Sequence, residues 1–199
     1  MTISHDGPAG VDDLYAGRPP WEIGCPQPAV AALADGGAFA GRFLDVGCGT
    51  GEHTLLAAAL GLDATGIERS PLALEAAERK ARERGLKARF LRQDALRLPE
   101  LGEIFDTALD SLVLHALRSE DRAGYLDGLR AVLRPGGRVF VLCYSDQQAP
   151  DTVPHTMSQA ELESCFADGW TLDSLEPSRS GSTVYPDGVA AWLASATRT

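Results

Sequence analysis

Residues 43–52 read Phe-Leu-Asp-Val-Gly-Cys-Gly-Thr-Gly-Glu, an apolar run followed by three glycines at alternate positions. An Ala-rich apolar run continues from there to Leu60 and Gly61. This succession predicts a buried strand, a tight turn and the start of a helix. Glycine permits the sharp turn and lets a ligand lie against bare main chain. The free N–H groups of the helix start favour a carboxylate or a phosphate.

The spacing of the glycines narrows the ligand class. The dinucleotide-binding pattern is Gly-x-Gly-x-x-Gly, whereas here the third glycine comes one residue earlier. The phosphate loop of nucleoside triphosphatases needs a Lys followed by Ser or Thr, and this pair is absent from residues 43–52. Taken alone, the motif also fits a glycine-rich turn in another kind of α/β protein.

Composition and charge restrict the function classes. The chain has 199 residues, of which 44% are hydrophobic, which is enough for one α/β domain with a full core. Its formal net charge is −10, and its densest basic cluster, residues 79–84, is interleaved with acid on a predicted helix face. Because proteins that track a nucleic-acid backbone carry a basic face, this charge weighs against nucleic acid as the substrate.

The sequence carries no signal for export, a membrane span or a metal site. No apolar run reaches membrane-spanning length, and residues 1–6 lack the basic and apolar regions of a signal peptide. The four cysteines are far apart and form no Cys-x-x-Cys pair and no Cys/His metal spacing. We therefore predict a cytoplasmic protein with reduced cysteines, no metal and no membrane partner.

Strand-like and helix-like stretches alternate along the chain. Ser70 and Pro71 are typical of a helix start, Gly85 of a helix end, and Ser158 with Glu161 of a capping box. Residues 1–20 are interpreted as an arm with little structure of its own. We expect strands at 42–46, 62–67, 88–92, 104–110, 138–144 and 170–176, a short strand near Thr183, and helices at 28–34, after the glycine turn to 60, and at 70–84, 119–133, 158–168 and 189–196.

This alternation predicts a parallel sheet with crossover helices, whose ligand lies beyond the carboxyl ends of the strands. Several acids and no lysine follow those ends. A phosphate would be poorly bound there, whereas a cation rich in hydroxyl and amino groups would be well bound. Beyond the glycine turn, the residues delivered to this edge are Glu68, Asp94, Asp110, His115, Tyr144, Ser145 and Asp146.

The succession from Phe43 to Tyr144 resembles the class I S-adenosylmethionine (SAM) methyltransferases, whose first motif is such a glycine loop. The resemblance implies a Rossmann-like α/β fold: a doubly wound, mostly parallel seven-stranded sheet with helices on both faces and a short N-terminal arm. It implies one SAM-dependent domain over residues 1–199, with 1–40 as arm and cap and 41–199 as sheet core. SAM would be the cofactor and S-adenosylhomocysteine (SAH) the product.

The same resemblance implies roles for individual residues. The glycine loop would hold the methionine moiety, Glu68 the ribose hydroxyls, and Asp94 the adenine amino group, with Arg69 and Ala95 beside the adenine. The Asp110 region would line the path to the methyl group. The cofactor-binding residues predicted in this way, together with Trp21 as a possible cover, are Asp45, Gly47, Cys48, Gly49, Gly51, Glu68, Arg69, Asp94, Ala95, Asp110 and Trp21.

The flanks indicate a narrower relation. Residues 21–28 and 142–146 are similar to small-molecule methyltransferases near the thiopurine and tellurite-resistance enzymes, and in particular to the heterocyclic toxin methyltransferases, which methylate hydroxyquinolone-like compounds. Residues 110–115 fit the pattern of that group, but residues 152–155 depart from its Gly-Pro-Arg-like run. The resemblance implies a small, heterocyclic or aromatic acceptor methylated on a hydroxyl, a thiol or a ring nitrogen.

His115 is the candidate general base, because histidine titrates near neutral pH, and Asp110 is placed with it in the catalytic set. A structural histidine lining the pocket is the alternative, since an acidic acceptor needs no base. His155 is a second candidate, whereas His5 and His53 are interpreted as peripheral. Tyr15 and Trp21 would close over the ligands or, alternatively, Trp21 would anchor the arm in the core.

Other functions stay open at the level of sequence. They are a dehydrogenase on the same fold, a nucleic-acid or protein methyltransferase, a metal-dependent catechol methyltransferase, a methyltransferase of some other natural product, and a non-catalytic SAM-binding module. Residues 110–113 lack the Asn/Asp-Pro-Pro-aromatic run of enzymes that methylate base amino groups. The predicted partner is a small-molecule methyl acceptor without nucleic acid, and the chain would be a monomer or a homodimer.

Overall fold

The computed structural model describes residues 13–149 and 151–199, which contain one seven-stranded sheet. The strand order is β3-β2-β1-β4-β5-β7-β6, and the strands up to β5 pair in parallel. Only β7 runs against its neighbours, because it pairs antiparallel with both β5 and β6. The expected sheet is confirmed, with strands β1 (Arg42–Val46), β2 (Asp63–Glu68), β3 (Arg89–Arg92), β4 (Phe105–Ser111), β5 (Leu133–Tyr144), β6 (Trp170–Ser180) and β7 (Val189–Arg198).

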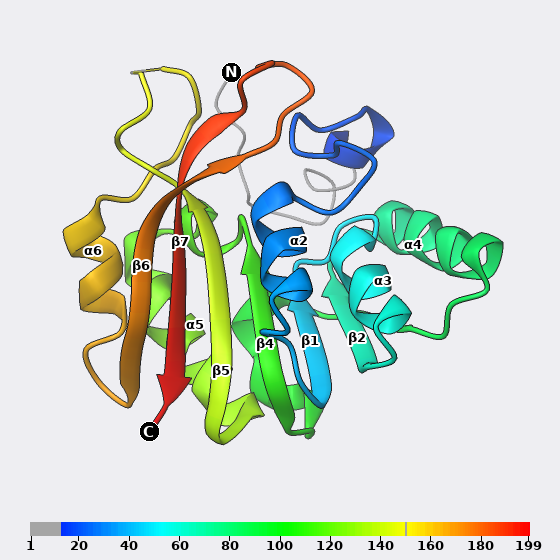
Figure 1. The fold of residues 1–199 in the computed structure, drawn as a ribbon, viewed down its shortest axis with the longest axis horizontal. Helices are drawn as coiled ribbons and strands as arrows, with labels where there is room; N and C mark the ends of the chain where they lie inside the picture. Colours follow the sequence, from blue (N-terminus) through cyan, green and yellow to red (C-terminus); the bar gives the residue numbers. More distant parts are fainter. Residues whose placement is uncertain (1–12, 150) are drawn as a thin grey trace.

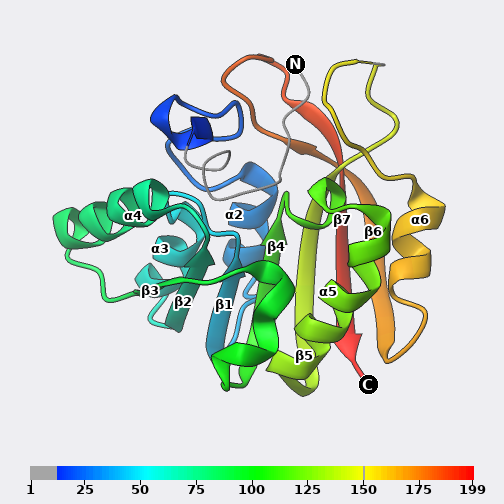
Figure 2. The same ribbon diagram turned by 180° about the vertical axis from the view of Figure 1, so that it is seen from behind.

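Helices cover both faces of the sheet (Figures 1 and 2). One face is covered by α2 (Pro28–Asp35) and α3 (Glu52–Ala59), with α4 (Pro71–Arg84) beside α3 at the β2–β3 end. The other is covered by α5 (Ser119–Val132) and the 3-10 segment η1 (Ala95–Leu101). A short 3-10 turn, η2 (Leu114–Ala116), precedes α5, and α6 (Gln159–Cys165) lies against β6. Residues 13–16 are also helical.

The alternation of side chains along the strands builds two hydrophobic layers. Phe43 and Phe140 pack toward α2 and α3, whereas their chain neighbours Leu44 and Val141 pack toward α5. All four side chains are buried. Burial of a side chain of this size contributes about 1.5–3 kcal/mol, so the two layers supply much of the free energy that holds the sheet together.

The predicted helix ends are confirmed at three positions. The Ser70 hydroxyl accepts a hydrogen bond from the Ala73 N–H at the start of α4, and Gly85 ends that helix in the left-handed conformation. At α6, the Ser158 hydroxyl accepts from the Glu161 N–H at 3.2 Å, while the Glu161 carboxylate accepts from the Ser158 N–H at 2.8 Å. These contacts satisfy backbone groups that a helix leaves without internal partners.

The prediction for the C-terminal region was wrong. Residues 189–196 form strand β7 rather than a helix, and Thr183 lies in the loop between β6 and β7 rather than in a strand. The Ala-rich composition favours a helix in isolation. In the folded chain the segment fills the gap between β5 and β6, where Ala194 pairs with Val141 and Ala196 with Val139. The hydrogen bonds and packing that β7 gains from strands on both sides outweigh the helix preference of its residues.

The structure describes only a part of the expected N-terminal arm. Residues 1–12 of the expected arm lie outside the described residues, and residues 13–16 form helix rather than irregular chain. Across residues 13–149 and 151–199, no helix has the length and apolar character that crossing a bilayer requires.

The order of the strands places a ligand-binding position between β1 and β4. Successive strands run outward from β1 through β2 to β3, and the chain then returns to β4 on the other side of β1. In sheets of this kind the crevice at the carboxyl ends of the two central strands is where ligands bind. The glycine turn after β1 and the η2 loop after β4 both lie at this point.

We predict that Gly51→Ala lowers the free energy of unfolding by roughly 2–4 kcal/mol, because the new Cβ meets both strain and close neighbours. Gly51 has φ of +86°, and a Cβ there would lie 2.8 Å from the Ala77 Cβ and 2.9 Å from the Phe90 ring. Gly85→Ala is the matched control, since Gly85 has φ of +64° with nothing within 4 Å of the added atom. Gly85→Ala should lower the free energy of unfolding by about 1–2 kcal/mol, the cost of the left-handed backbone conformation alone. Equal losses in urea unfolding would contradict the packing explanation.

Candidate active site

A cavity of about 660 Å³ opens at the carboxyl edge of the sheet. The glycine turn and the ends of β2, β3, β4 and β5 contribute to its lining. Two segments from elsewhere complete the lining. One is the segment before α2, residues 14–27, which contributes Tyr15 and Trp21 and which we call the cover; the other is the loop that carries Pro154 and His155. The cavity therefore combines the central crevice of the sheet with a cover from the N-terminal part of the chain.

The glycine turn presents bare main chain to this cavity. The Cys48 N–H donates to the Ile67 carbonyl of β2 at 2.9 Å, which fixes the turn against the neighbouring strand. Gly49 has φ of +52°, and a Cβ at this residue would lie 2.8 Å from the Tyr15 hydroxyl. The covering segment thus lies directly on the turn, at a separation that only glycine allows.

Two carboxylates at the ends of β2 and β3 are fixed by main-chain hydrogen bonds. Glu68 accepts from the N–H groups of Gly49 at 3.2 Å, Arg69 at 2.6 Å and Ser70 at 3.0 Å. Asp94 accepts from the Leu96 N–H at 3.0 Å. Both line the cavity, and the Arg69 guanidinium stands 3.9 Å from the Asp94 carboxylate. They form a rigid pair of acceptors beside the glycine turn.

Asp45 is buried below this turn. Its Oδ2 accepts from the Thr54 hydroxyl at 2.7 Å, and its Oδ1 has no hydrogen-bond partner among the described residues. Burial, opposed by the hydrogen bond from Thr54 and assisted by the nearby carboxylates of Glu68 and Asp110, raises the pKa of Asp45 to about 7. The site is therefore poised to hold a cation, since a positive ligand would relieve this concentration of negative charge.

Asp110 supports the loop after β4 rather than lining the cavity. Its carboxylate accepts from the N–H groups of Val113 at 2.9 Å and Leu114 at 3.0 Å, and from the Tyr125 hydroxyl at 2.7 Å. Burial raises its pKa to about 6, although these three donors oppose the rise. The contacts fix the start of η2, and His115 belongs to this same turn.

The remaining part of the cavity carries aromatic and imidazole side chains. The rings of His115 and Tyr144 lie 4.7 Å apart at 53°, and both side chains are mostly buried. Leu112, which also lines the cavity, has φ of +73°, a conformation that costs about 1–3 kcal/mol for a residue other than glycine. Its N–H donates to the Leu142 carbonyl at 2.8 Å, so pairing with β5 stabilises the strained turn.

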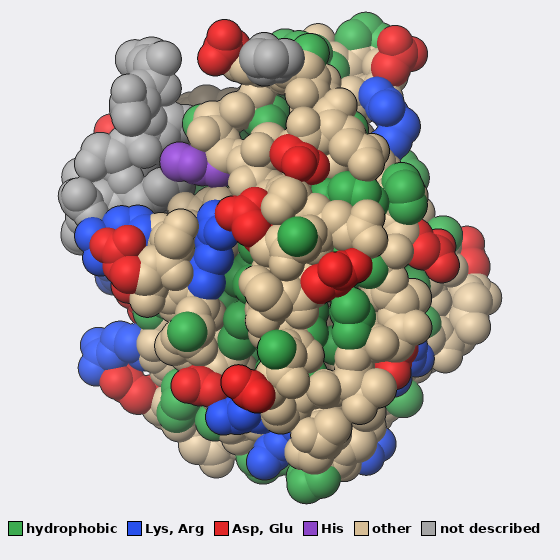
Figure 3. All heavy atoms as spheres, turned by 90° about the vertical axis from the view of Figure 1, so that its left-hand side faces the viewer, with side chains coloured by type: hydrophobic (Ala, Val, Ile, Leu, Met, Phe, Trp, Pro, Cys, Tyr) green, Lys and Arg blue, Asp and Glu red, His purple; other side chains and the backbone are tan. Residues whose placement is uncertain are grey.

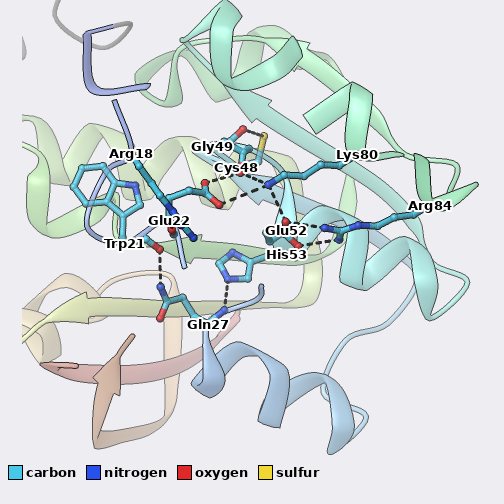
Figure 4. A network of polar contacts seen from close by, with 11 residues as sticks. Arg18, Trp21, Glu22, Gln27, Cys48, Gly49, Glu52, His53, Lys80 and Arg84 are labelled. Carbon is cyan, nitrogen blue, oxygen red and sulfur yellow. Dashed lines mark hydrogen bonds and ion pairs between the residues drawn. The ribbon is translucent and has the colours of Figure 1, made fainter. Parts of the chain in front are cut away.

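The covering segment is joined to α3 by His53. The Nε2 of His53 accepts from the Gln27 N–H at 3.0 Å, directly before α2 (Figure 4). Burial lowers the pKa of His53 to about 4, so the ring is neutral at physiological pH and able to accept this bond. The interpretation of His53 as peripheral was therefore wrong, because its ring also lines the cavity.

The structure brings together most of the residues expected at the site. Asp45, Gly51 and Asp110 are buried outside the lining, and Asp146 is not among the described residues that line it. His5 lies outside the described residues. Sequence reasoning missed Gln93 and Glu22 as lining residues, although Gln93 directly precedes Asp94 at the end of β3. The expected residues that line the cavity are Trp21, Gly47, Cys48, Gly49, Glu68, Arg69, Asp94, Ala95 and His115.

Acids in the described part of the chain do not assemble into a metal site. Within residues 13–149 and 151–199, no group of three or more His, Cys, Asp or Glu side chains could hold a metal ion. The carboxylates of Asp45, Glu68, Asp94 and Asp110 are instead separated by the main-chain and hydroxyl donors described above.

Comparison with known proteins assigns the chain to a family. A family model described as a methyltransferase domain matches residues 43–137. The chain is also 34% identical over 170 residues to the 2-heptyl-1-hydroxyquinolin-4(1H)-one methyltransferase of Mycobacteroides abscessus, across 84% of this chain and 75% of that protein. The chain belongs to the class I SAM-dependent methyltransferases. The resemblance inferred from the glycine turn and the strand ends is thereby confirmed.

Solved structures agree with this assignment. One, described by the conversion of a disulfide bond into a thioacetal group during echinomycin biosynthesis, aligns with a TM-score of 0.87 and 36% identity, over 96% of this chain and 93% of that chain. The magnesium protoporphyrin IX methyltransferase of Synechocystis PCC 6803 with bound SAM shares the fold, with a TM-score of 0.66 and 21% identity over 86% of this chain and 76% of that one. The present chain is thus a SAM-dependent methyltransferase that acts on a small molecule.

The cavity fits SAM on its own chemistry. SAM is a sulfonium cation with two ribose hydroxyls and an adenine amino group. Carboxylates attract the cation and accept hydrogen bonds from the hydroxyl and amino groups. Glu68 and Asp94 offer free acceptor capacity at the cavity, and the buried Asp45 adds negative charge with an unpartnered oxygen. The glycine turn leaves main chain exposed where a Cβ would otherwise intrude. The residues present therefore match the charge and the hydrogen-bonding groups of the cofactor.

We predict that Asp45→Asn changes the pH dependence of stability. The pKa of Asp45 is raised from 3.8 to about 7 in the folded state, so its contribution to stability is complete below pH 3.8 and is lost as pH rises through about 7. The wild type should therefore lose roughly 2–4 kcal/mol relative to Asp45→Asn across this window. Urea unfolding of both proteins at a series of pH values measures the difference in their free energies of unfolding. The titration of other groups is common to both proteins and cancels in this difference. Parallel curves would contradict the prediction.

Proposed function

We propose that this methyltransferase moves the methyl group of SAM to a hydroxyl, thiol or ring nitrogen of a small aromatic or heterocyclic acceptor. The observation that carries the proposal is that one cavity is lined by two chemically different sets of residues. Fixed carboxylates and bare glycine main chain form one part, and His115, Tyr144, Pro154 and His155 line the other. The first part suits the cofactor, and the second suits a flat acceptor that stacks on aromatic surfaces.

The relatives support this acceptor class. The Mycobacteroides abscessus relative is named for a heptyl-hydroxyquinolone, a flat heterocycle with a hydroxyl group. The structure aligned over 96% of this chain is described by conversion of a disulfide into a thioacetal, which favours sulfur as a second candidate acceptor atom. We therefore include oxygen and sulfur acceptors as alternatives for the same cavity, with natural products outside the heterocyclic class as a further possibility.

In this proposal the protein aligns the reactants, removes a proton and excludes water. SAM, when bound, supplies an electrophilic methyl group, so alignment provides most of the acceleration. His115 accepts the proton of the acceptor as it becomes the nucleophile. Asp110 acts as a positioning residue, because it holds the η2 turn on which His115 lies. Tyr15 and Trp21 close the cofactor part against solvent.

The remaining expectations belong to the proposal as well. On the face shown in Figure 3, acidic and basic side chains are interspersed, and the net charge of the chain is −10, which supports a small acceptor rather than nucleic acid. The four cysteines are free thiols, which supports a cytoplasmic location. We propose a metal-independent enzyme, because the strand-end acids have other partners; a monomer and a homodimer both remain compatible with it.

The proposal is tested by SAH release from SAM with a panel of hydroxyquinolones, phenols, thiols, cyclic disulfides and thiopurines. Turnover on one class identifies the acceptor atom. SAM binding without turnover on any class would instead favour a non-catalytic module or an unrelated natural-product acceptor. Binding of a nicotinamide dinucleotide in place of SAM would revive the dehydrogenase alternative, and loss of turnover on chelation would contradict a metal-independent reaction.

We predict that His115→Ala lowers kcat/KM by roughly 100-fold or more on weakly acidic acceptors such as alkyl thiols, because a positioned base contributes about 10²–10⁴-fold. The defect should shrink on acidic phenols, which are already ionised, while the affinity for SAM stays unchanged. His155→Ala is the matched control and should affect the KM of the acceptor more than kcat. An equal defect on acidic and weakly acidic acceptors would remove His115 as the base.

A further inference from the structure

The segment before α2 is attached to the body of the protein on two sides. On one side, Gln27 bonds to the β6–β7 loop: its Oε1 accepts from the Gly181 N–H at 2.6 Å, and its Nε2 donates to the Gly181 carbonyl at 3.3 Å. The Pro20 carbonyl accepts from the Thr183 N–H at 2.8 Å. These contacts involve main chain and a neutral amide, so they fix the base of the segment and are insensitive to salt.

On the other side, toward the glycine turn and α4, the segment is also attached through the charged side chain of Glu22. Its Oε2 accepts from the Thr50 hydroxyl at 2.5 Å, and its Oε1 stands 3.6 Å from the Lys80 ammonium. Lys80 also donates to the Thr50 hydroxyl at 2.6 Å. The side chains of Glu22 and Lys80 are only 17% and 20% exposed, so solvent screens this contact less than it screens a surface ion pair.

Lys80 belongs to a small group of charges that is balanced only when Glu22 is in place (Figure 4). The ammonium stands 2.8 Å from the Glu52 carboxylate, which also binds the Arg84 guanidinium through two hydrogen bonds of 2.8 and 2.9 Å. With Glu22 present, two acids face two bases. When Glu22 moves away, Lys80 and Arg84 share one acid, and a partly buried positive charge is left uncompensated.

Glu22 holds the residues that cover the cofactor part of the cavity. Glu22 is adjacent to Trp21 in the chain, and both line the cavity with Tyr15, whose hydroxyl rests on Gly49. Thr50 belongs to the glycine turn itself, so the contact ties the cover directly to the main chain expected to hold SAM.

We propose that Glu22, Thr50 and Lys80 form a latch that controls how fast the cofactor product leaves. Lys80 and Glu22 are positioning residues, since they act by holding Tyr15 and Trp21 over the cavity. The inference rests on the proposed function to the extent that SAM and SAH occupy the part of the cavity beside Glu68. The latch joins Lys80 of α4 and Glu22 of the segment before α2 to Thr50 of the glycine turn, and none of these three side chains takes part in methyl transfer itself.

The test is the dissociation rate of SAH from the immobilised full-length protein, measured by surface plasmon resonance. Lys80→Met should raise this rate by roughly 3- to 30-fold, the range expected for losing a charge-assisted contact that is partly screened. Lys80→Arg should restore a rate close to that of the wild type. Arg79→Met is the matched control, because Arg79 is the neighbouring residue of α4 and, within the described part of the chain, forms an exposed ion pair with Glu83. It should leave the rate unchanged.

Two further measurements separate a latch from a general structural role. Glu22→Gln leaves the Lys80–Glu52 and Arg84–Glu52 pairs intact and should reproduce the faster release with little change in Tm. Raising NaCl from about 50 to about 500 mM should speed release from the wild type more than from Lys80→Met. Unchanged release from Lys80→Met and Glu22→Gln, or a Lys80→Arg protein as fast as Lys80→Met, would overturn the latch alone. A wild type that binds neither SAM nor SAH would overturn the proposed function as well.

Discussion

The structure depends on the close approach of other segments to the bare main chain of the glycine turn. Tyr15 from the cover, Val113 from the loop after β4, and Phe90 from β3 occupy space that side chains on Gly49, Gly47 and Gly51 would fill. These contacts come from segments far apart in the sequence, so the turn is where the two halves of the sheet and the cover meet. The same absence of side chains leaves main-chain groups available to a ligand. One constraint therefore sets both the packing and the binding surface.

Below this turn, the fold tolerates buried carboxylates at a cost in stability. Asp45 and Asp110 have raised pKa values because burial disfavours their charged forms. Asp110 is stabilised by three donors and serves to hold the η2 loop, whereas Asp45 keeps one oxygen unpartnered. A cationic cofactor beside these groups would offset the cost of their negative charge. The strain at Leu112 lies at the same edge of the sheet, consistent with the storage of unfavourable energy at functional positions.

In the proposed function, different elements form the two parts of the cavity. The strand ends and the glycine turn form the part for the cofactor, together with a cover that Glu22 joins to Thr50. The part for the acceptor is formed by η2, the end of β5 and the loop that carries His155. Substrate selectivity can therefore change through these loops without disturbing the cofactor part.

The sequence by itself determined the parallel sheet, the glycine turn, the helix caps at Ser70 and Ser158, and the acids at the ends of β2 and β3, because each of these is encoded in a local pattern. Four other features depend on the tertiary structure. Residues 189–196 became a strand because two neighbouring strands pair with them. Asp110 turned inward to main-chain donors and Tyr125, and His53 turned toward the cavity to accept from Gln27. The latch joins Thr50 to Glu22, 28 residues earlier in the chain, and to Lys80, 30 residues later. Such choices depend on which distant groups remain to be paired or buried, which no local pattern records.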